Sequence, residues 1–274
     1  MEIDKNSLLN GYGLSCIENY VIAILKKYIS NWETIFFKSF ILFEDILRDF
    51  AVYKEKYAYF SGVERIQDVC SELGLIQINY ESNISMEEIQ DDLDFAFVRV
   101  NEKFIRDNYK TKLWREDHFI YVKKMAEGWF FVNDTPLDEG RISNPYFEQI
   151  FSNECFYLSL NRRHLEDESC LEYFLGNLKK DSKKDINFKA TCLEFRDAIG
   201  VMRVIYRRIS LYLSRYMQIG MIDSFVNELD KIYMKAEYMN LKGIWDNTQF
   251  KMYFDFVLRN EAKIKDKILK GLEK

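Results

Sequence analysis

The sequence is poor in proline and histidine and shows no regular cysteine spacing. Of 274 residues only two are proline, Pro136 and Pro145, and both lie in one short segment. No low-complexity tract, internal repeat or Pro/Gly-rich linker interrupts the rest, which argues against repeat architectures. The five cysteines, at positions 16, 70, 155, 170 and 192, form no CxxC motif. This odd, irregular set argues against a disulfide framework or a zinc site and indicates reduced thiols.

Further absences narrow the class of protein. No stretch approaches the ~20 uncharged apolar residues that span a bilayer, so no membrane helix is expected. The first ten residues, MEIDKNSLLN, lack a basic region followed by an apolar run, so no signal peptide is expected. A formal net charge of −5 argues against general nucleic-acid binding. No metal or nucleotide motif is present, so no cofactor is predicted, and the chain is expected to be cytoplasmic.

Hydrophobic periodicity predicts an α+β fold. Helical spacing covers residues 16–29, 33–50 and 62–74 before the strand-like runs begin, whereas helical spacing alone is present after about residue 165. We therefore predict a mixed domain over residues 1–163 and an all-helical domain over 164–274. The expected strands cover 75–80, 95–101, 118–123, 129–133 and 155–160, and the later helices 169–179, 188–219, 222–241 and 248–272.

Cys16 is the first candidate for chemistry, because it opens a predicted helix. A helix N-terminus favours negative charge, and the thiolate is the nucleophilic form of cysteine. Gly11 and Gly13 precede it and are expected to let the backbone turn tightly. Six residues before the cysteine stands Asn10, whose amide is a candidate oxyanion donor together with the Cys16 backbone N–H.

His118 is the candidate base, and the predicted hairpin that it opens supplies an orienting residue. A loop centred on Ala126 places His118 opposite Asp134, whereas a two-residue turn at 127–128 places Asn133 on the face of the histidine. The first register is preferred, so Asp134 is predicted to orient the imidazole, with Asn133 as the alternative. Each residue alone also fits an ordinary structural role, and the hypothesis depends on all three converging.

These three motifs resemble a known enzyme superfamily. Asn10…Cys16 at a helix start, His118-Phe-Ile-Tyr-Val and Phe-Phe-Val-Asn133-Asp134 resemble the papain-like cysteine peptidases, and most closely the bacteriocin-leader peptidases and butirosin-type acyltransferases. In papain-like enzymes a glutamine stands six residues before the cysteine, where this chain has Asn10, one methylene shorter. The butirosin-type relatives also carry a helical C-terminal half, whose late segment is similar to residues 243–272 here.

The resemblance implies a papain-like core and an amide-forming acyltransferase in natural-product biosynthesis, of nonribosomal-peptide or closthioamide type. Its donor would be a thioester on an acyl or peptidyl carrier protein, with phosphopantetheine present only as the arm of that carrier. Its acceptor would be a small amine, such as a diamine. The alternatives are a cysteine peptidase that removes a leader peptide and a catalytically inactive interaction module.

An acyl-enzyme must be protected from water, and aromatic side chains are candidates for the wall of its pocket. Those considered are Tyr12, Trp114, Phe119 and Trp129. A carrier protein is acidic, and Arg203, Arg207 and Arg208 form a basic stripe at helical spacing that is predicted to bind it. The alternative is a helix face whose arginines pair with the acids of residues 223–230.

Overall fold

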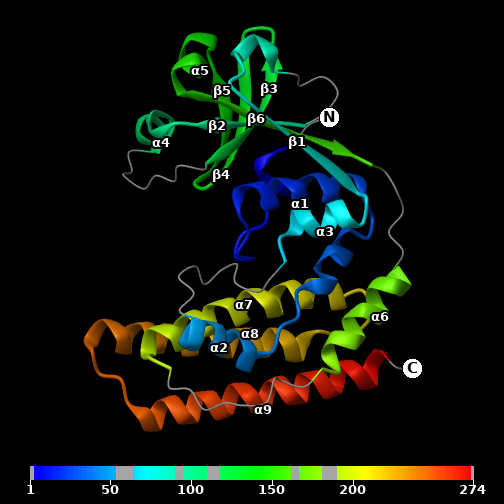
Figure 1. Ribbon diagram of the computed structural model, residues 1–274, viewed down its shortest axis with the longest axis vertical. Coiled ribbons are helices and arrows are strands. Elements are labelled where there is room, and N and C mark those ends of the chain that lie inside the picture. The colour runs from blue at the N-terminus through cyan, green and yellow to red at the C-terminus, as the bar shows by residue number, and fades with distance from the viewer. Residues whose placement is uncertain are drawn as a thin grey trace. The chain divides into compact units, whose positions relative to one another are not determined.

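The computed structural model describes residues 3–53, 64–89, 95–109, 118–161, 167–180 and 190–272. The chain forms two compact units (Figure 1). The sheet unit contains Met1–Asn10, Leu14–Trp32 and Ile66–Leu165, and the helical unit contains Gly11–Gly13, Glu33–Arg65 and Glu166–Lys274. The predicted α+β class is confirmed, with a six-stranded antiparallel sheet and a helical C-terminal region.

The sheet has the strand order β1-β6-β2-β3-β4-β5, and every neighbouring pair is antiparallel. Five of these strands follow predicted runs. The sixth, β5, was not predicted, because its sequence LDEGRI lacks apolar alternation and its burial is mostly partial. The strands are β1 (Ile76–Ser82), β2 (Phe95–Val100), β3 (Phe119–Met125), β4 (Gly128–Asp134), β5 (Leu137–Ile142) and β6 (Phe151–Leu160).

The central strand β2 is buried on both faces of the sheet. Phe97 points toward helix α1 (Cys16–Tyr28), where its ring centroid lies 5.0 Å from that of Tyr20. Because side chains alternate along a strand, Ala96 and Val98 lie on the opposite face. There they join a core with helices α4 (Glu102–Tyr109) and α5 (Asn144–Ile150). The unit also contains η1 (Lys5–Ser7), α3 (Ile66–Glu72) and η3 (Met86–Glu88).

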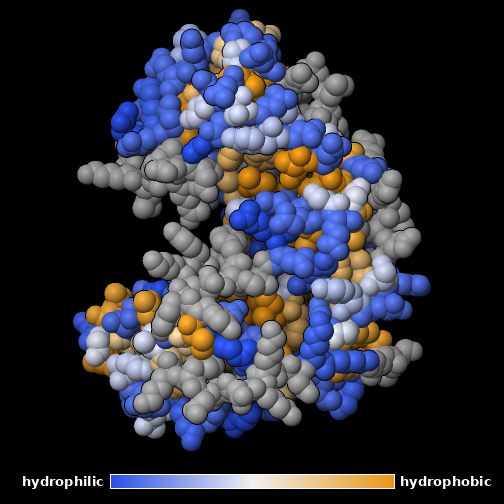
Figure 2. All heavy atoms as spheres, viewed as in Figure 1, coloured by the Kyte–Doolittle hydropathy of each residue, from blue (hydrophilic) through white to orange (hydrophobic). Residues whose placement is uncertain are grey.

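The helical unit is built around α7 (Cys192–Leu213), whose side chains are the most extensively buried of its helices. Phe195 of α7 packs against Phe43 of α2 (Phe43–Tyr53), and Tyr206 packs against Phe225 of α8 (Gly220–Lys242). The other elements are η2 (Trp32–Lys38), α6 (Asp167–Leu178) and α9 (Asn247–Leu272). Figure 2 shows hydrophobic residues among hydrophilic ones on the surface of this unit. Of the helices that are described, none is long and apolar enough to cross a membrane.

Residues 33–50 do not form the single helix that the sequence predicts. They form η2 and then α2, which begins at Phe43, where the carboxylate of Glu261 on α9 accepts the backbone N–H at 3.1 Å. A helix start needs such an acceptor, because its first N–H groups have no partner within the helix. The described part of this segment, residues 33–53, groups with the later helices. The linear division into 1–163 and 164–274 stays a prediction, and in this segment the contacts follow a different grouping.

Candidate active site

Cys16 is the first residue of α1, as the sequence predicts, and it is half-buried. The helix start is closed by a capping box: the Ser15 hydroxyl accepts the N–H of Glu18, and the Glu18 carboxylate accepts the N–H of Ser15 at 2.8 Å. The second oxygen of Glu18 accepts the N–H of Ile66 at the start of α3. This arrangement fixes the first turn of α1, where the helix dipole favours a thiolate.

His118 is bound to Asn133. Its Nε2 lies 2.7 Å from Oδ1 of Asn133, and both side chains are buried. The orientation of the Asn133 amide is set on its other side, because Nδ2 donates to the Pro136 carbonyl at 2.7 Å and to the Tyr109 hydroxyl at 3.2 Å. Oδ1 can only accept, so Nε2 of the imidazole carries the hydrogen. In the neutral ring the lone pair is then on Nδ1, which is the nitrogen able to take a proton.

The preference for Asp134 as the orienting residue is therefore corrected. In the hairpin, Met125 pairs with Gly128 and Tyr121 with Val132, so the two-residue turn is at residues 126–127, in neither register considered from the sequence. Continued by one position, this register places Asn133 opposite Ile120, on the face of His118, while Asp134 lies on the other face. A shift of one residue at the turn decides between the two candidates.

Tyr20 connects the cysteine-bearing helix to this hairpin. It lies one turn after Cys16, and its hydroxyl is 3.2 Å from the carbonyl oxygen of Phe119 and 3.0 Å from that of Val132. These carbonyls belong to the residue after His118 and the residue before Asn133. Burial raises the pKa of Tyr20 well above its usual value, and the charges of Asp134 and Cys16 raise it further. The start of α1 thus lies against the strand ends that carry the base and its partner.

The sequence did not reveal three members of this network. Tyr20 carries a signal in the sequence, because it stands four residues after Cys16 and residues four apart share a helix face. Its ring packs against Phe97 of the sheet. Tyr109, whose pKa is raised by burial, and the Pro136 carbonyl have none, because only the folded chain brings them to Asn133.

The remaining predicted residues lie in different surroundings. Asn10 is exposed, Tyr12 is half-buried in the loop of the helical unit, and Phe119 is buried with its ring edge-on to Phe156. Trp129 is fully buried and stacks on Phe147, so its predicted contact with substrate is corrected to a place in the core. Trp114 lies outside the described residues.

The predicted docking stripe of arginines is also corrected. Arg203 and Arg207 both bind the carboxylate of Asp230 on α8, which is the alternative that pairs them with the acids of 223–230. Arg208 is only 1% exposed and donates to backbone carbonyls within the helical unit. Asp230 therefore offsets part of the positive charge of Arg203 and Arg207, while binding of an acidic partner protein stays a prediction.

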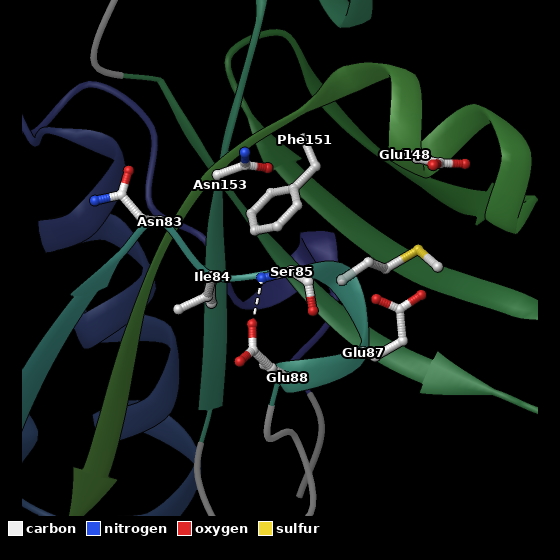
Figure 3. Close-up of a pocket in the computed structure, with 9 residues that line it drawn as sticks. Asn83, Ile84, Ser85, Glu87, Glu88, Glu148, Phe151 and Asn153 are labelled. Carbon is white, nitrogen blue, oxygen red and sulfur yellow. Dashed lines mark hydrogen bonds between the residues drawn. The ribbon is translucent and has the colours of Figure 1, made fainter.

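A pocket of about 320 Å³ lies elsewhere in the sheet unit (Figure 3). Its carboxylates come from η3 and α5, and the Glu88 carboxylate accepts the N–H of Ser85 at the start of η3 at 2.6 Å. None of the described residues predicted for catalysis lines it, so the candidate site is built on α1 and the β3–β4 hairpin instead. The pocket is lined by Asn83, Ile84, Ser85, Met86, Glu87, Glu88, Glu148, Phe151 and Asn153.

Two further tests of the site concern metals and known proteins. Over the ranges that the structure describes, no group of three or more His, Cys, Asp or Glu side chains is placed to hold a metal ion. Comparisons of the chain with protein-family models, with curated proteins and with solved structures return no match.

Proposed function

We propose that the chain is a cysteine-dependent acyltransferase with a papain-like core, which forms an amide from a carrier-protein thioester and an amine. The observation that carries this proposal is the 2.7 Å hydrogen bond between Nε2 of His118 and Oδ1 of Asn133. It leaves the basic lone pair on Nδ1, in a buried setting, on the hairpin against which the Cys16 helix packs.

In the first half-reaction Nδ1 of His118 takes the proton of the Cys16 thiol, which gives a thiolate and an imidazolium. The thiolate attacks the thioester carbonyl, and the negative charge moves to the carbonyl oxygen. The backbone N–H of Cys16 and, in this proposal, the amide of Asn10 donate hydrogen bonds to that oxygen. When the intermediate collapses, the bond between carbon and the phosphopantetheine sulfur breaks. The departing thiolate takes a proton from the His118 imidazolium, and the acyl group remains on Cys16.

In the second half-reaction the amine attacks the acyl-enzyme. Nδ1 of His118 removes a proton from the attacking nitrogen, the amide forms, and Cys16 leaves as the thiolate. Asn133 holds the ring in one orientation through both steps. An aliphatic amine is mostly protonated at pH 7, so a positioned base and a dry pocket both contribute to the rate.

The test uses an acyl-carrier thioester with and without a diamine. The wild-type chain is expected to form the amide and to accumulate an acyl group on Cys16 when the amine is left out, as seen by intact mass. Cys16→Ala is expected to abolish both, and His118→Gln to slow both by at least about 10²-fold. The matched control is Cys192→Ser, a change at a buried thiol of the helical unit.

The competing functions give different results. Cleavage of peptides without aminolysis of thioesters would identify a peptidase and overturn the transferase. An interaction module would leave Cys16 inert to iodoacetamide at pH 7, whereas a helix-start thiolate is expected to be alkylated readily.

A further inference from the structure

Tyr109 connects the amide that orients His118 to a carboxylate on the edge strand β5. Asn133 and Asp138 are directly paired in the β4–β5 ladder, and paired residues of antiparallel strands point to the same face. Tyr109 is the last residue of α4, and its hydroxyl lies 3.2 Å from Nδ2 of Asn133 and hydrogen-bonds the Asp138 carboxylate. All four side chains belong to the sheet unit, so the connection is made within one unit.

Each hydrogen bond in this series has a defined direction. An ionised carboxylate can only accept, so the Tyr109 hydroxyl gives its one hydrogen to Asp138. The Tyr109 oxygen is then an acceptor for Nδ2 of Asn133. With Nδ2 on that side, Oδ1 of Asn133 faces Nε2 of His118, 2.7 Å away. The direction of the bonds is therefore the same from the imidazole to the carboxylate, and the carboxylate sets it.

The two outer members of the series are held by further contacts. The ring of Tyr109 meets that of Phe104 edge-on, with 5.8 Å between the centroids. Oδ1 of Asp138 accepts the N–H of Glu139 at 2.8 Å. Burial is the main cause of the raised pKa of Tyr109, and the charge of Asp138 and the hydrogen bond to its carboxylate raise it further. The hydroxyl therefore keeps its hydrogen over the pH range in which histidine titrates.

The orientation of the Asn133 amide depends on two acceptors. The Pro136 carbonyl takes one hydrogen of Nδ2 at 2.7 Å, and the Tyr109 oxygen takes the other. An amide rotated by half a turn fills the same space with its oxygen and nitrogen exchanged. The rotated amide would set Oδ1 against the Pro136 carbonyl and against a hydroxyl whose hydrogen is on Asp138. Without Asp138 that hydroxyl is free to donate to the rotated amide, so one of the two preferences is lost.

We infer that Tyr109 and Asp138 are positioning residues for His118, which act through the amide of Asn133. By fixing that amide they keep the ring hydrogen on Nε2 and the lone pair on Nδ1, the nitrogen that exchanges protons in the proposed reaction. The catalytic meaning of this inference rests on the proposed function. The tautomer of His118, in contrast, can be measured in the chain without any substrate.

The experiment determines the tautomer of His118 from long-range ¹H–¹⁵N NMR spectra of the full chain labelled with ¹⁵N-histidine, at about pH 8.5, where an ordinary histidine is neutral. The sequence has only two histidines, and the signals that disappear in His118→Gln assign the ring. The wild-type chain is expected to show the Nε2–H tautomer in large excess. Tyr109→Phe and Asp138→Asn are each expected to shift the ratio by about five- to tenfold toward the Nδ1–H tautomer.

Glu139→Gln is the matched control, because Glu139 is the next residue of the same strand and points to the other face. Its carboxylate accepts the N–H of Lys5 at 3.0 Å, a bond that glutamine can keep, and no shift of the tautomer ratio is expected. The double variant of Tyr109→Phe and Asp138→Asn is expected to match the larger single effect, because both changes break one series of bonds.

Turnover of an acyl thioester of N-acetylcysteamine with a diamine is the second readout. A less firmly oriented ring is expected to lower kcat by about three- to tenfold and to change KM much less. Asp138→Glu, which keeps a carboxylate, is expected to retain more activity than Asp138→Asn. Near-ultraviolet circular dichroism verifies that each variant is folded. Should Asp138→Asn fail to fold, Tyr109→Phe decides the question, because it keeps the ring beside Phe104.

A tautomer ratio in the folded Tyr109→Phe or Asp138→Asn variant that equals that of Glu139→Gln overturns the inference. So do shifts that add in the double variant, because the two residues would then act separately. The spectra need no acyl chemistry, so the two proposals fail separately. Absence of thioester turnover in the wild-type chain overturns the proposed function, while the tautomer ratios still decide the role of Tyr109 and Asp138.

Discussion

The end of the β3–β4 hairpin and the interior of the helical unit bury polar side chains of different kinds. At the hairpin the buried groups are an imidazole, an amide and a phenol, and their hydrogen bonds lie within one small region. In the helical unit they are the guanidinium of Arg208 and the carboxyl of Glu261, and each binds the backbone of a distant segment. The first arrangement places a proton at a defined atom, whereas the second joins parts of the chain.

Asn133→Ala gives the largest effect expected from this comparison. Without the amide oxygen the His118 ring loses its fixed hydrogen and its orientation, so kcat for thioester aminolysis is expected to fall about 10²-fold. Asn133→Asp keeps an acceptor and is expected to retain more activity. The matched control is Asp134→Asn, on the other face of the strand, for which we expect a change below about threefold. A larger loss in the Asp134 variant would restore Asp134 as the orienting residue.

Glu261→Gln probes the helical interior through pH. Burial raises the pKa of Glu261 to about 7, although the Phe43 N–H and Lys265 act in the opposite direction. The folded chain therefore binds this proton more tightly than the unfolded chain, and wild-type stability falls as the pH rises from about 4.5 to about 7. Glutamine at position 261 does not ionise, so the variant does not lose stability in this pH range.

The variant is expected to match the wild type near pH 4.5 and to be more stable by about 2–3 kcal/mol above pH 8, as measured by urea unfolding. Glu228→Gln, at an exposed carboxylate of α8, serves as control and is expected to change stability by less than about 0.5 kcal/mol at either pH. If Glu261→Gln changes the free energy of unfolding equally at both pH values, burial does not raise the pKa of Glu261.

Tyr20→Phe gives the smallest effect of the three. The ring keeps its place against Phe97, but the hydroxyl near the Phe119 and Val132 carbonyls is lost. We expect a loss of about 1–2 kcal/mol in the free energy of unfolding and a fall in turnover smaller than that of Asn133→Ala. Tyr238→Phe, at an exposed ring of α8, is the control. An unchanged urea midpoint would remove Tyr20 from the set of groups that hold α1 on the hairpin.

The sequence predicts those parts of the molecule whose signals are local. The capped start of α1 and the apolar runs of β3 and β4 depend on residues that are adjacent in the sequence. Cys16 therefore lies at the start of a helix and His118 next to the start of a strand, as predicted. The sequence favours Asp134 over Asn133 incorrectly, because the position of the turn sets the register. That position depends on pairing energies that a short polar turn does not display. The short helices α4 and α5 were missed for lack of a long apolar period.

The roles of the arginines depend on contacts made at long range. Charge spacing on α7 indicates a basic stripe whether its side chains face a partner protein, Asp230 or the carbonyls of residues 11–13. Only burial separates these cases. The same holds for Trp129, because the sequence pattern of an aromatic residue in a strand does not distinguish a pocket wall from the hydrophobic core. Its burial places it in the core.

The grouping of residues 33–65 with the C-terminal helices has a consequence for synthesis on the ribosome. Helix α2 emerges early, yet its packing partner α7 follows the whole of the sheet-forming sequence. During translation the apolar side of α2 is therefore exposed to water until α7 has been synthesised, which happens after all six strands. Nascent chains halted before α7 should consequently recruit a holdase chaperone, and release should follow once α7 leaves the exit tunnel.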